Sequence, residues 1–172
     1  MIARDFSYWL NKRGSTEPTV LFSTPVFSGA AAYYGNFAVV VSGDDENKTG
    51  YLTAVRIASA NTPQEGSILL NSRRVTHVAL PLWDPSLDQL VRIGMNLPAD
   101  QPLPQGAFSV AIRQWYIPLW LQPMDYLIPN EPRFQGFELS AFALQAEQEL
   151  DLGLSRLSDF FVDRGQLQDA QA

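Results

Sequence analysis

The sequence contains no cysteine, one histidine and only two lysines among its 172 residues. Without cysteine the chain can form neither a disulfide nor a thiolate metal site. A single histidine is too little for a usual structural zinc site. We therefore expect neither a metal nor a cofactor.

Long hydrophobic runs are also missing. No stretch approaches the ~18 consecutive apolar residues that a membrane-spanning helix needs. The N-terminal residues lack the apolar run that follows the charges of a secretory signal peptide. The sequence thus predicts a protein that neither spans nor binds a membrane and that stays in the cytoplasm or in an assembled particle.

Positive charge is scarce, because the chain has only 12 Lys and Arg residues but 18 Asp and Glu residues, which gives a net charge of −6. Residues 1–74 carry a net charge of +1 and residues 75–172 a net charge of −7. An acidic surface repels phosphate backbones, and basic residues beside aromatic ones, such as Arg113 beside Trp115, do not offset this. We therefore expect no nucleic-acid partner.

The familiar catalytic and phosphate-binding motifs are absent, including the glycine-rich dinucleotide and nucleotide loops and the nucleophile elbow. The acidic turn at residues 44–47 lacks the alternation of carboxylates that a calcium loop requires. His77 and Asp84 remain the candidates for acid–base chemistry. Asp84 stands before Pro85 and Ser86, a pattern more typical of a helix start.

Hydrophobic periodicity predicts a short helix over residues 3–13, a second helix beginning at residues 84–88, and helical structure from residue 137 onward. Alternating or β-branched segments predict strands, two of which form a hairpin around the polar turn at residues 43–50 and two of which form a second pair. The predicted strands are 19–23, 37–42, 51–58, 67–70, 74–80 and 107–117.

These elements predict an α+β fold, mainly an antiparallel β-sheet or a small barrel or sandwich of about six strands. A short N-terminal helix and a C-terminal helical segment complete it. A chain of this length suits a single domain, which we place at residues 1–165, followed by a polar tail at 166–172.

The most distinctive feature is residues 113–134, where aromatic side chains alternate with prolines. Proline every five or six residues prevents continuous strand pairing, so the segment is expected to run as an extended arm. Three interpretations stay open: part of the core, a wall of a ligand groove, or a contact surface for another chain. As contact residues we select, with two aromatics of the N-terminal helix, Phe6, Trp9, Trp115, Trp120, Tyr126 and Phe134.

Together these features favour a non-catalytic structural subunit of a larger assembly, of the virion, tail or injection-machine type. It would act by contacts with other protein subunits, in a homo- or hetero-oligomer. One alternative is a β-barrel that binds a small hydrophobic ligand between Trp115, Trp120, Tyr126 and His77. Others are an acidic inhibitor that mimics nucleic acid and an enzyme centred on His77 and Asp84.

Overall fold

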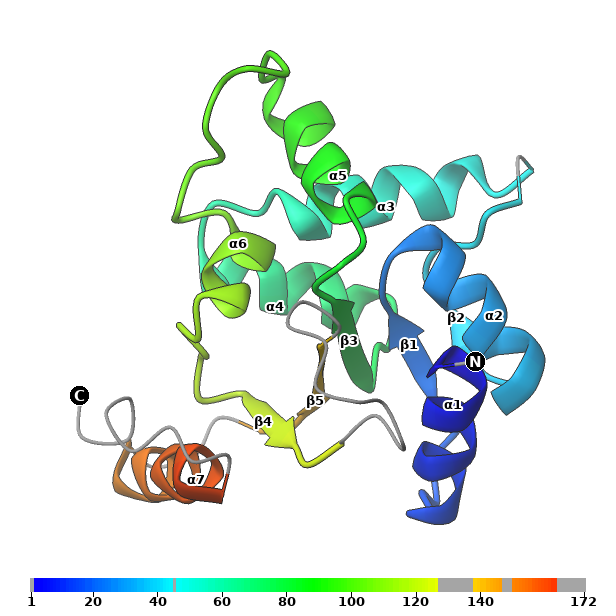
Figure 1. The fold of residues 1–172 in the computed structure, drawn as a ribbon, viewed down its shortest axis with the longest axis vertical. Helices are drawn as coiled ribbons and strands as arrows, with labels where there is room; N and C mark the ends of the chain where they lie inside the picture. The colour runs from blue at the N-terminus through cyan, green and yellow to red at the C-terminus, as the bar shows by residue number, and fades with distance from the viewer. Residues whose placement is uncertain (1, 45, 127–137, 147–149, 164–172) are drawn as a thin grey trace.

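A computed structural model describes the chain except for residues 1, 45, 127–137, 147–149 and 164–172 (Figure 1). Phe134 and the predicted tail at 166–172 therefore lie outside the described residues. The described part contains, in chain order, α1 (Ile2–Lys12), β1 (Val20–Phe22), α2 (Pro25–Gly35), β2 (Ala38–Val39), α3 (Lys48–Ala58), α4 (Pro63–Ser72), β3 (His77–Pro81), α5 (Ser86–Met95), α6 (Phe108–Arg113), β4 (Leu121–Met124), β5 (Leu139–Leu144) and α7 (Leu150–Asp163).

The five strands form one mixed sheet in the order β2-β1-β3-β5-β4. β1 pairs in parallel with both β2 and β3, whereas β5 pairs antiparallel with β3 and β4. The α+β class is confirmed. The expectation of a mainly antiparallel sheet or a closed barrel is wrong, because half of the strand pairings are parallel and β2 and β4 end an open sheet.

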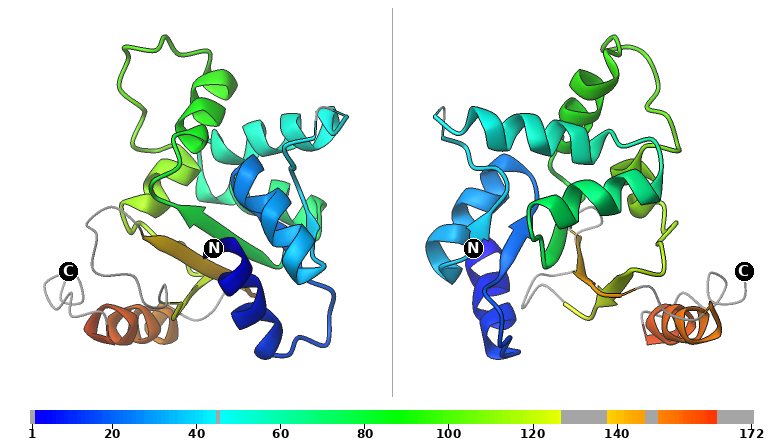
Figure 2. Two further views of the ribbon diagram at one scale, coloured as in Figure 1. Left: turned by 45° about the vertical axis from the view of Figure 1, so that its right-hand side comes forward. Right: turned by 180° about the vertical axis from the view of Figure 1, so that it is seen from behind.

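Helices cover both faces of this sheet (Figure 2). Adjacent strand residues point to opposite faces, and Leu21 and Ala79 accordingly pack with α1 and α2 while Phe22 and Val78 pack with α3 to α6. In Figure 2, α1 lies in front of the strands in one view and α4 lies in front of them in the other. The core therefore consists of two layers, one on each side of the sheet.

Three predicted strands are helices instead. Residues 51–58 belong to α3, 67–70 to α4 and 107–117 largely to α6, so the predicted hairpin and the predicted second strand pair are wrong. In α3 the buried residues include Gly50, Thr53, Ala54, Ile57 and Ala58. Their spacing is the i, i+3, i+4, i+7 pattern of a helix, which the alternation of Tyr51, Thr53, Val55 and Ile57 concealed.

The reverse error occurs near the C-terminus, where predicted helix over residues 139–144 is the strand β5. β5 pairs with β3, which precedes it in the chain by some sixty residues. Nonlocal pairing of this kind overrides local periodicity. The helix at α1, the strands β1 and β3 and the helix start at α5 are confirmed.

Candidate functional site

The strand order identifies one end of the sheet as the natural ligand site. From β1 the chain first crosses to β2 on one side and later returns to β3 on the other. In open sheets with parallel strands, ligands bind outside the carboxyl ends of the strands at such a reversal of strand order. The carboxyl ends of β1 and β3 are followed by Ser23 and Leu82, and we call this region the carboxyl-end crevice.

Buried hydroxyl groups gather after β1. Ser23, Thr24 and Ser28 are each fully buried, and their hydroxyls have no hydrogen bond of ordinary geometry to the described residues. Thr24 precedes α2 as its N-cap but its side chain does not cap the helix. Buried polar groups are nearly always hydrogen-bonded, which makes the Ser23 and Ser28 hydroxyls unusual. The Thr24 hydroxyl is close enough to Asp84 to lower the pKa of that carboxyl.

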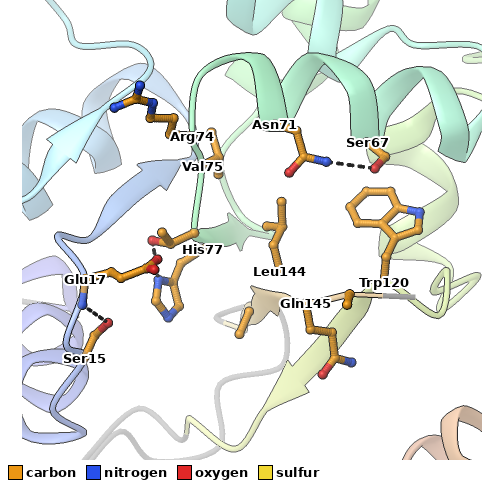
Figure 3. Close-up of a pocket in the computed structure, with 13 residues that line it drawn as sticks. Ser15, Glu17, Ser67, Asn71, Arg74, Val75, His77, Trp120, Leu144 and Gln145 are labelled. Carbon is orange, nitrogen blue, oxygen red and sulfur yellow. Dashed lines mark hydrogen bonds between the residues drawn. The ribbon is translucent and has the colours of Figure 1, made fainter. Parts of the chain in front are cut away.

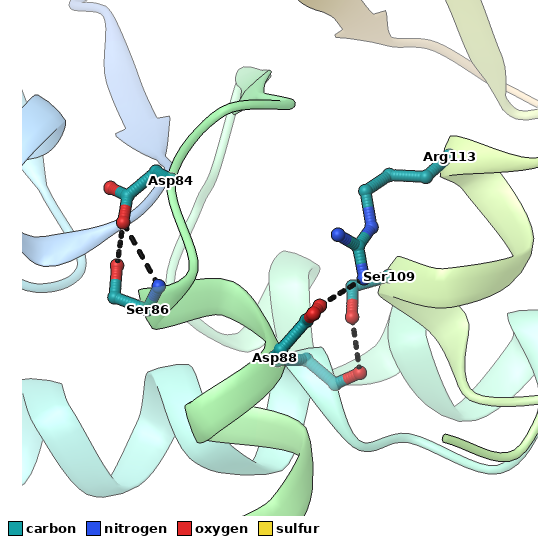
Figure 4. Close-up of polar contacts among 6 residues, drawn as sticks. Asp84, Ser86, Asp88, Ser109 and Arg113 are labelled. Atoms are coloured by element: carbon teal, nitrogen blue, oxygen red, sulfur yellow. Dashed lines mark hydrogen bonds and ion pairs between the residues drawn. The ribbon is translucent and has the colours of Figure 1, made fainter. Parts of the chain in front are cut away.

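Asp84 follows β3 and lies near Thr24, and Figure 4 shows its carboxylate hydrogen-bonded to Ser86. Its Oδ1 accepts hydrogen bonds from the Ser86 backbone N–H at 2.9 Å and from the Ser86 hydroxyl at 2.6 Å. Burial alone would raise the pKa of Asp84, but hydrogen bonding by the Ser86 hydroxyl, the Thr24 hydroxyl and the Ser86 N–H lowers the pKa below its usual value. Asp84 is therefore a partly exposed carboxylate, ionised at neutral pH, with the hydroxyls of Ser86 and Thr24 beside it.

A cavity of about 450 Å³ is lined by Pro25, in the first turn of α2, and by residues between Ser42 and Leu52. Pro25, Tyr51 and Leu52 form its apolar wall, and Asn47 and Lys48 are among its polar residues. Asn47 begins α3, where its side-chain oxygen accepts a hydrogen bond from Gly50 N–H at 3.0 Å. The crevice thus combines hydroxyls and a carboxylate near β3 with a mixed apolar and polar cavity near β2.

A second, larger hollow lies at the opposite end of the sheet, where β1 and β3 begin (Figure 3). We call it the amino-end groove, and its volume is about 740 Å³. Glu17 and His77 lie on one side of it, Ser67 and Asn71 of α4 lie above, and Trp120 lies on the far side. His77 and Trp120 thus line one hollow, as the ligand-binding alternative expected, although Trp115 and Tyr126 do not line it.

The lone imidazole is part of this groove and not of the crevice. His77 Nδ1 lies 2.8 Å from the Thr76 hydroxyl. Burial lowers the pKa of His77, which keeps the ring neutral at neutral pH. Because His77 opens β3 and Asp84 follows the end of the same strand, the two residues lie at opposite ends of the sheet. The structure therefore does not bring His77 and Asp84 into one site, and whether the chain is an enzyme stays an open prediction.

Two of the selected contact residues are buried in the hydrophobic core. Phe6 is fully buried and Tyr126 is 2% exposed, and their rings meet edge-on with centroids 5.2 Å apart. Burial and then the charge of Asp5 raise the pKa of Tyr126 to about 12. Neither side chain can touch another protein, so the prediction that they form a contact surface is corrected: they belong to the core.

Among the other selected aromatics that the structure describes, Trp9, Trp115 and Trp120 are partly buried. Trp9 packs against Phe6 and lies under the guanidinium of Arg13, which is 4.2 Å from the ring centroid. Trp115 contacts Phe160 and Phe161 of α7, and Trp120 stacks on Phe108 of α6. Their role as contact residues stays a prediction.

Two arginines that could have contacted nucleic acid interact with other residues of this chain instead. Arg113 pairs with Asp88, and Arg73 donates a hydrogen bond to Thr53 at 2.7 Å. Within the described ranges, no group of three or more His, Asp or Glu side chains is placed to hold a metal ion. The helices of the described part are all too short or too polar to cross a membrane.

The fold itself has a known counterpart. It is similar to the crystal structure of the C-terminal globular domain of an oligosaccharyltransferase from Archaeoglobus fulgidus, with a TM-score of 0.60. The match covers 83% of this chain and 96% of that one, at 12% sequence identity, so it shows the fold alone. The sequence matches no protein-family model and no curated protein.

Sequence reasoning found Asp84 as a helix start but missed the hydroxyls of Ser23, Thr24 and Ser28. The available signal was a short apolar strand followed at once by Ser-Thr-Pro, which is typical of a strand that ends at a helix start. That signal does not reveal which strand lies beside it. Only the parallel pairing of β1 with β3 brings Thr24 next to Asp84.

Proposed function

We propose that this chain is a non-catalytic interaction domain of a larger protein assembly, which holds a hydroxyl-bearing group of a partner at the carboxyl-end crevice. The observation that supports this most directly is Asp84, a partly exposed carboxylate held in its ionised form after the carboxyl end of β3. A ligand hydroxyl can donate a hydrogen bond to this carboxylate. The apolar wall of Pro25, Tyr51 and Leu52 would hold the carbon skeleton beside that hydroxyl.

The fold comparison supports the assembly part of the proposal. The similar structure is one domain of an oligosaccharyltransferase, and the match extends over nearly all of that domain. By analogy, the chain would work as one part of a glycosyl-transfer system whose other parts carry the chemical step. The virion, tail or injection-machine version of the assembly has no support in this comparison.

The positions of the ionisable residues favour binding over chemistry. Asp84 has hydroxyls rather than a base as its neighbours, and the imidazole of His77 belongs to the other end of the sheet. Hydrogen bonds to the ionised form stabilise the Asp84 carboxylate, which makes it a good acceptor and a poor proton donor at neutral pH. We accordingly assign Asp84 a recognition role.

The proposal is tested by titrating ¹⁵N-labelled full-length chain with a short peptide containing Asn-Ala-Thr, a glycosylation acceptor sequence, and with the same peptide carrying Val in place of Thr. We expect the Thr peptide to shift the amide resonances of Ser23, Thr24 and Ser86, and the Val peptide to bind at least tenfold more weakly. Asp84→Asn should weaken Thr-peptide binding, whereas the exposed loop variant Asp100→Asn should not. Equal binding of both peptides, or shifts confined to other surfaces, would contradict the proposal.

A further inference from the structure

The amino-end groove carries a separate inference, because it shares no lining residue with the carboxyl-end crevice. Its volume of about 740 Å³ falls within the roughly 300–1,000 Å³ of small-molecule sites. The groove is formed by segments far apart in sequence: the chain before β1, helix α4, the start of β3, and the chain on either side of β4 and β5 (Figure 3).

Hydroxyl and amide groups dominate its polar lining. Ser15, Ser67, Asn71, Thr76 and Gln145 all contribute. Asn71 donates from Nδ2 to the Ser67 hydroxyl at 3.2 Å, which fixes the amide plane and turns its oxygen into the available acceptor. Such neutral groups both donate and accept hydrogen bonds, and they match a ligand that does the same.

The charges of the lining balance. Among the described residues that line it, the charged side chains are Glu17 and Arg74, and burial lowers the pKa of His77 so that the imidazole adds no charge at neutral pH. Neither Glu17 nor Arg74 forms an ion pair with another described residue. A groove with a net charge near zero favours a neutral ligand over an anion or a cation.

An aromatic platform forms the far wall. The indole of Trp120 lies at 13° to the ring of Phe108, with centroids 5.7 Å apart, so one face is covered and its orientation is fixed. The backbone N–H of Gln145 donates to the Trp120 carbonyl at 3.0 Å, which ties this wall to the end of β5. Val75 and Leu144 extend the apolar surface.

From this combination we infer that the amino-end groove binds a neutral saccharide of one or two rings. A sugar ring has a face of C–H groups that packs on an indole and a rim of hydroxyls that pair with amides, hydroxyls and a carboxylate. Trp120 would stack on the sugar ring, and Asn71 and Glu17 would form hydrogen bonds with its hydroxyls. Arg74 would balance the negative charge of Glu17. This inference does not depend on the function proposed for the crevice.

The test uses the full chain labelled with ¹⁵N and three disaccharides: cellobiose, maltose and N,N′-diacetylchitobiose. Sorbitol serves as a polyol without a ring, and inorganic phosphate as an anion. We expect at least one disaccharide to shift the Trp120 indole N–H resonance saturably, with neither sorbitol nor phosphate doing so. Trp120→Phe, which keeps an aromatic ring in the apolar wall, assigns that resonance.

Asn71→Ala and Glu17→Gln change exposed side chains, so both variants should fold normally, and each should weaken disaccharide binding at least fivefold. Gln64→Ala, an exposed position on the same helix outside the groove, is the matched control and should bind as the unmodified chain does. The inference is overturned if none of the three disaccharides shifts the resonance, if phosphate binds more tightly than they do, or if Asn71→Ala and Glu17→Gln bind as Gln64→Ala does. Loss of peptide binding at the crevice in Asp84→Asn should leave the disaccharide response intact, so the two proposals fail independently.

Discussion

Asp84 accepts two hydrogen bonds at one oxygen from Ser86, from the backbone N–H at 2.9 Å and from the hydroxyl at 2.6 Å. Ser86 is the first residue of α5, so this pair joins the end of β3 to the start of the helix that covers it. The same carboxylate lies beside Thr24, which follows β1. One residue thus links a structural role with the proposed recognition role.

Replacing Asp84 should destabilise the fold in a pH-dependent way. The pKa of Asp84 is lowered in the folded chain, so its contribution is present above the unfolded pKa near 3.8 and is lost as pH falls through the folded pKa. We expect Asp84→Ala to reduce the free energy of unfolding by about 1 kcal/mol at pH 7, and by less at acidic pH. Urea unfolding at both pH values measures this, with Asp100→Ala as the control. A penalty that is unchanged at low pH would contradict the assignment.

Phe6→Ala separates a core role from a contact role for the N-terminal helix. Phe6 is fully buried and packs on Trp9, Phe27 and Tyr126. Its truncation should cost about 3–5 kcal/mol of unfolding free energy. Tyr8 on the same helix is 51% exposed, and Tyr8→Ala should change stability by no more than about 0.5 kcal/mol. Thermal unfolding of both variants tests this, and similar small effects would place Phe6 outside the core.

Gly50→Ala should disrupt the packing of α3 on β2. A Cβ at Gly50 would collide with the backbone carbonyl of Val40, which cannot rotate away as a side-chain tip can. We expect a loss of about 1–3 kcal/mol in unfolding free energy. Gly106 has open space where its Cβ would lie, so Gly106→Ala is the matched control and should be close to neutral. Denaturant unfolding distinguishes them, and equal effects would show that α3 does not approach Val40 this closely.

The ion pair between Arg113 and Asp88 should contribute little. It connects α6 with α5, but the Asp88 side chain is 40% exposed. We expect a double-mutant cycle with Arg113→Ala and Asp88→Ala to give a coupling of about 0.5 kcal/mol that falls in about 1 M salt. A coupling that is large and insensitive to salt would instead indicate a buried, functionally constrained pair.

Some of the missed elements carried a local signal. Thr62 and Glu65 form a helix start of the capping-box type, since the Thr62 hydroxyl accepts from Glu65 N–H at 3.1 Å and the Glu65 carboxylate accepts from Asn61 N–H at 2.9 Å. Asn47 caps α3 in a similar way. Reading these caps before the alternation of apolar residues would have predicted α3 and α4 as helices.

The amino-acid sequence by itself determined the α+β class, the N-terminal helix, the strands β1 and β3 and the start of α5, because each depends on neighbours within a few residues. Only the tertiary structure decided that β5 is a strand between β3 and β4, that Thr24 meets Asp84, and that His77 lies with Trp120 at the other end of the sheet. These relations join residues between 17 and 66 positions apart. Their free energy comes from strand pairing and burial between distant segments, which local periodicity does not encode.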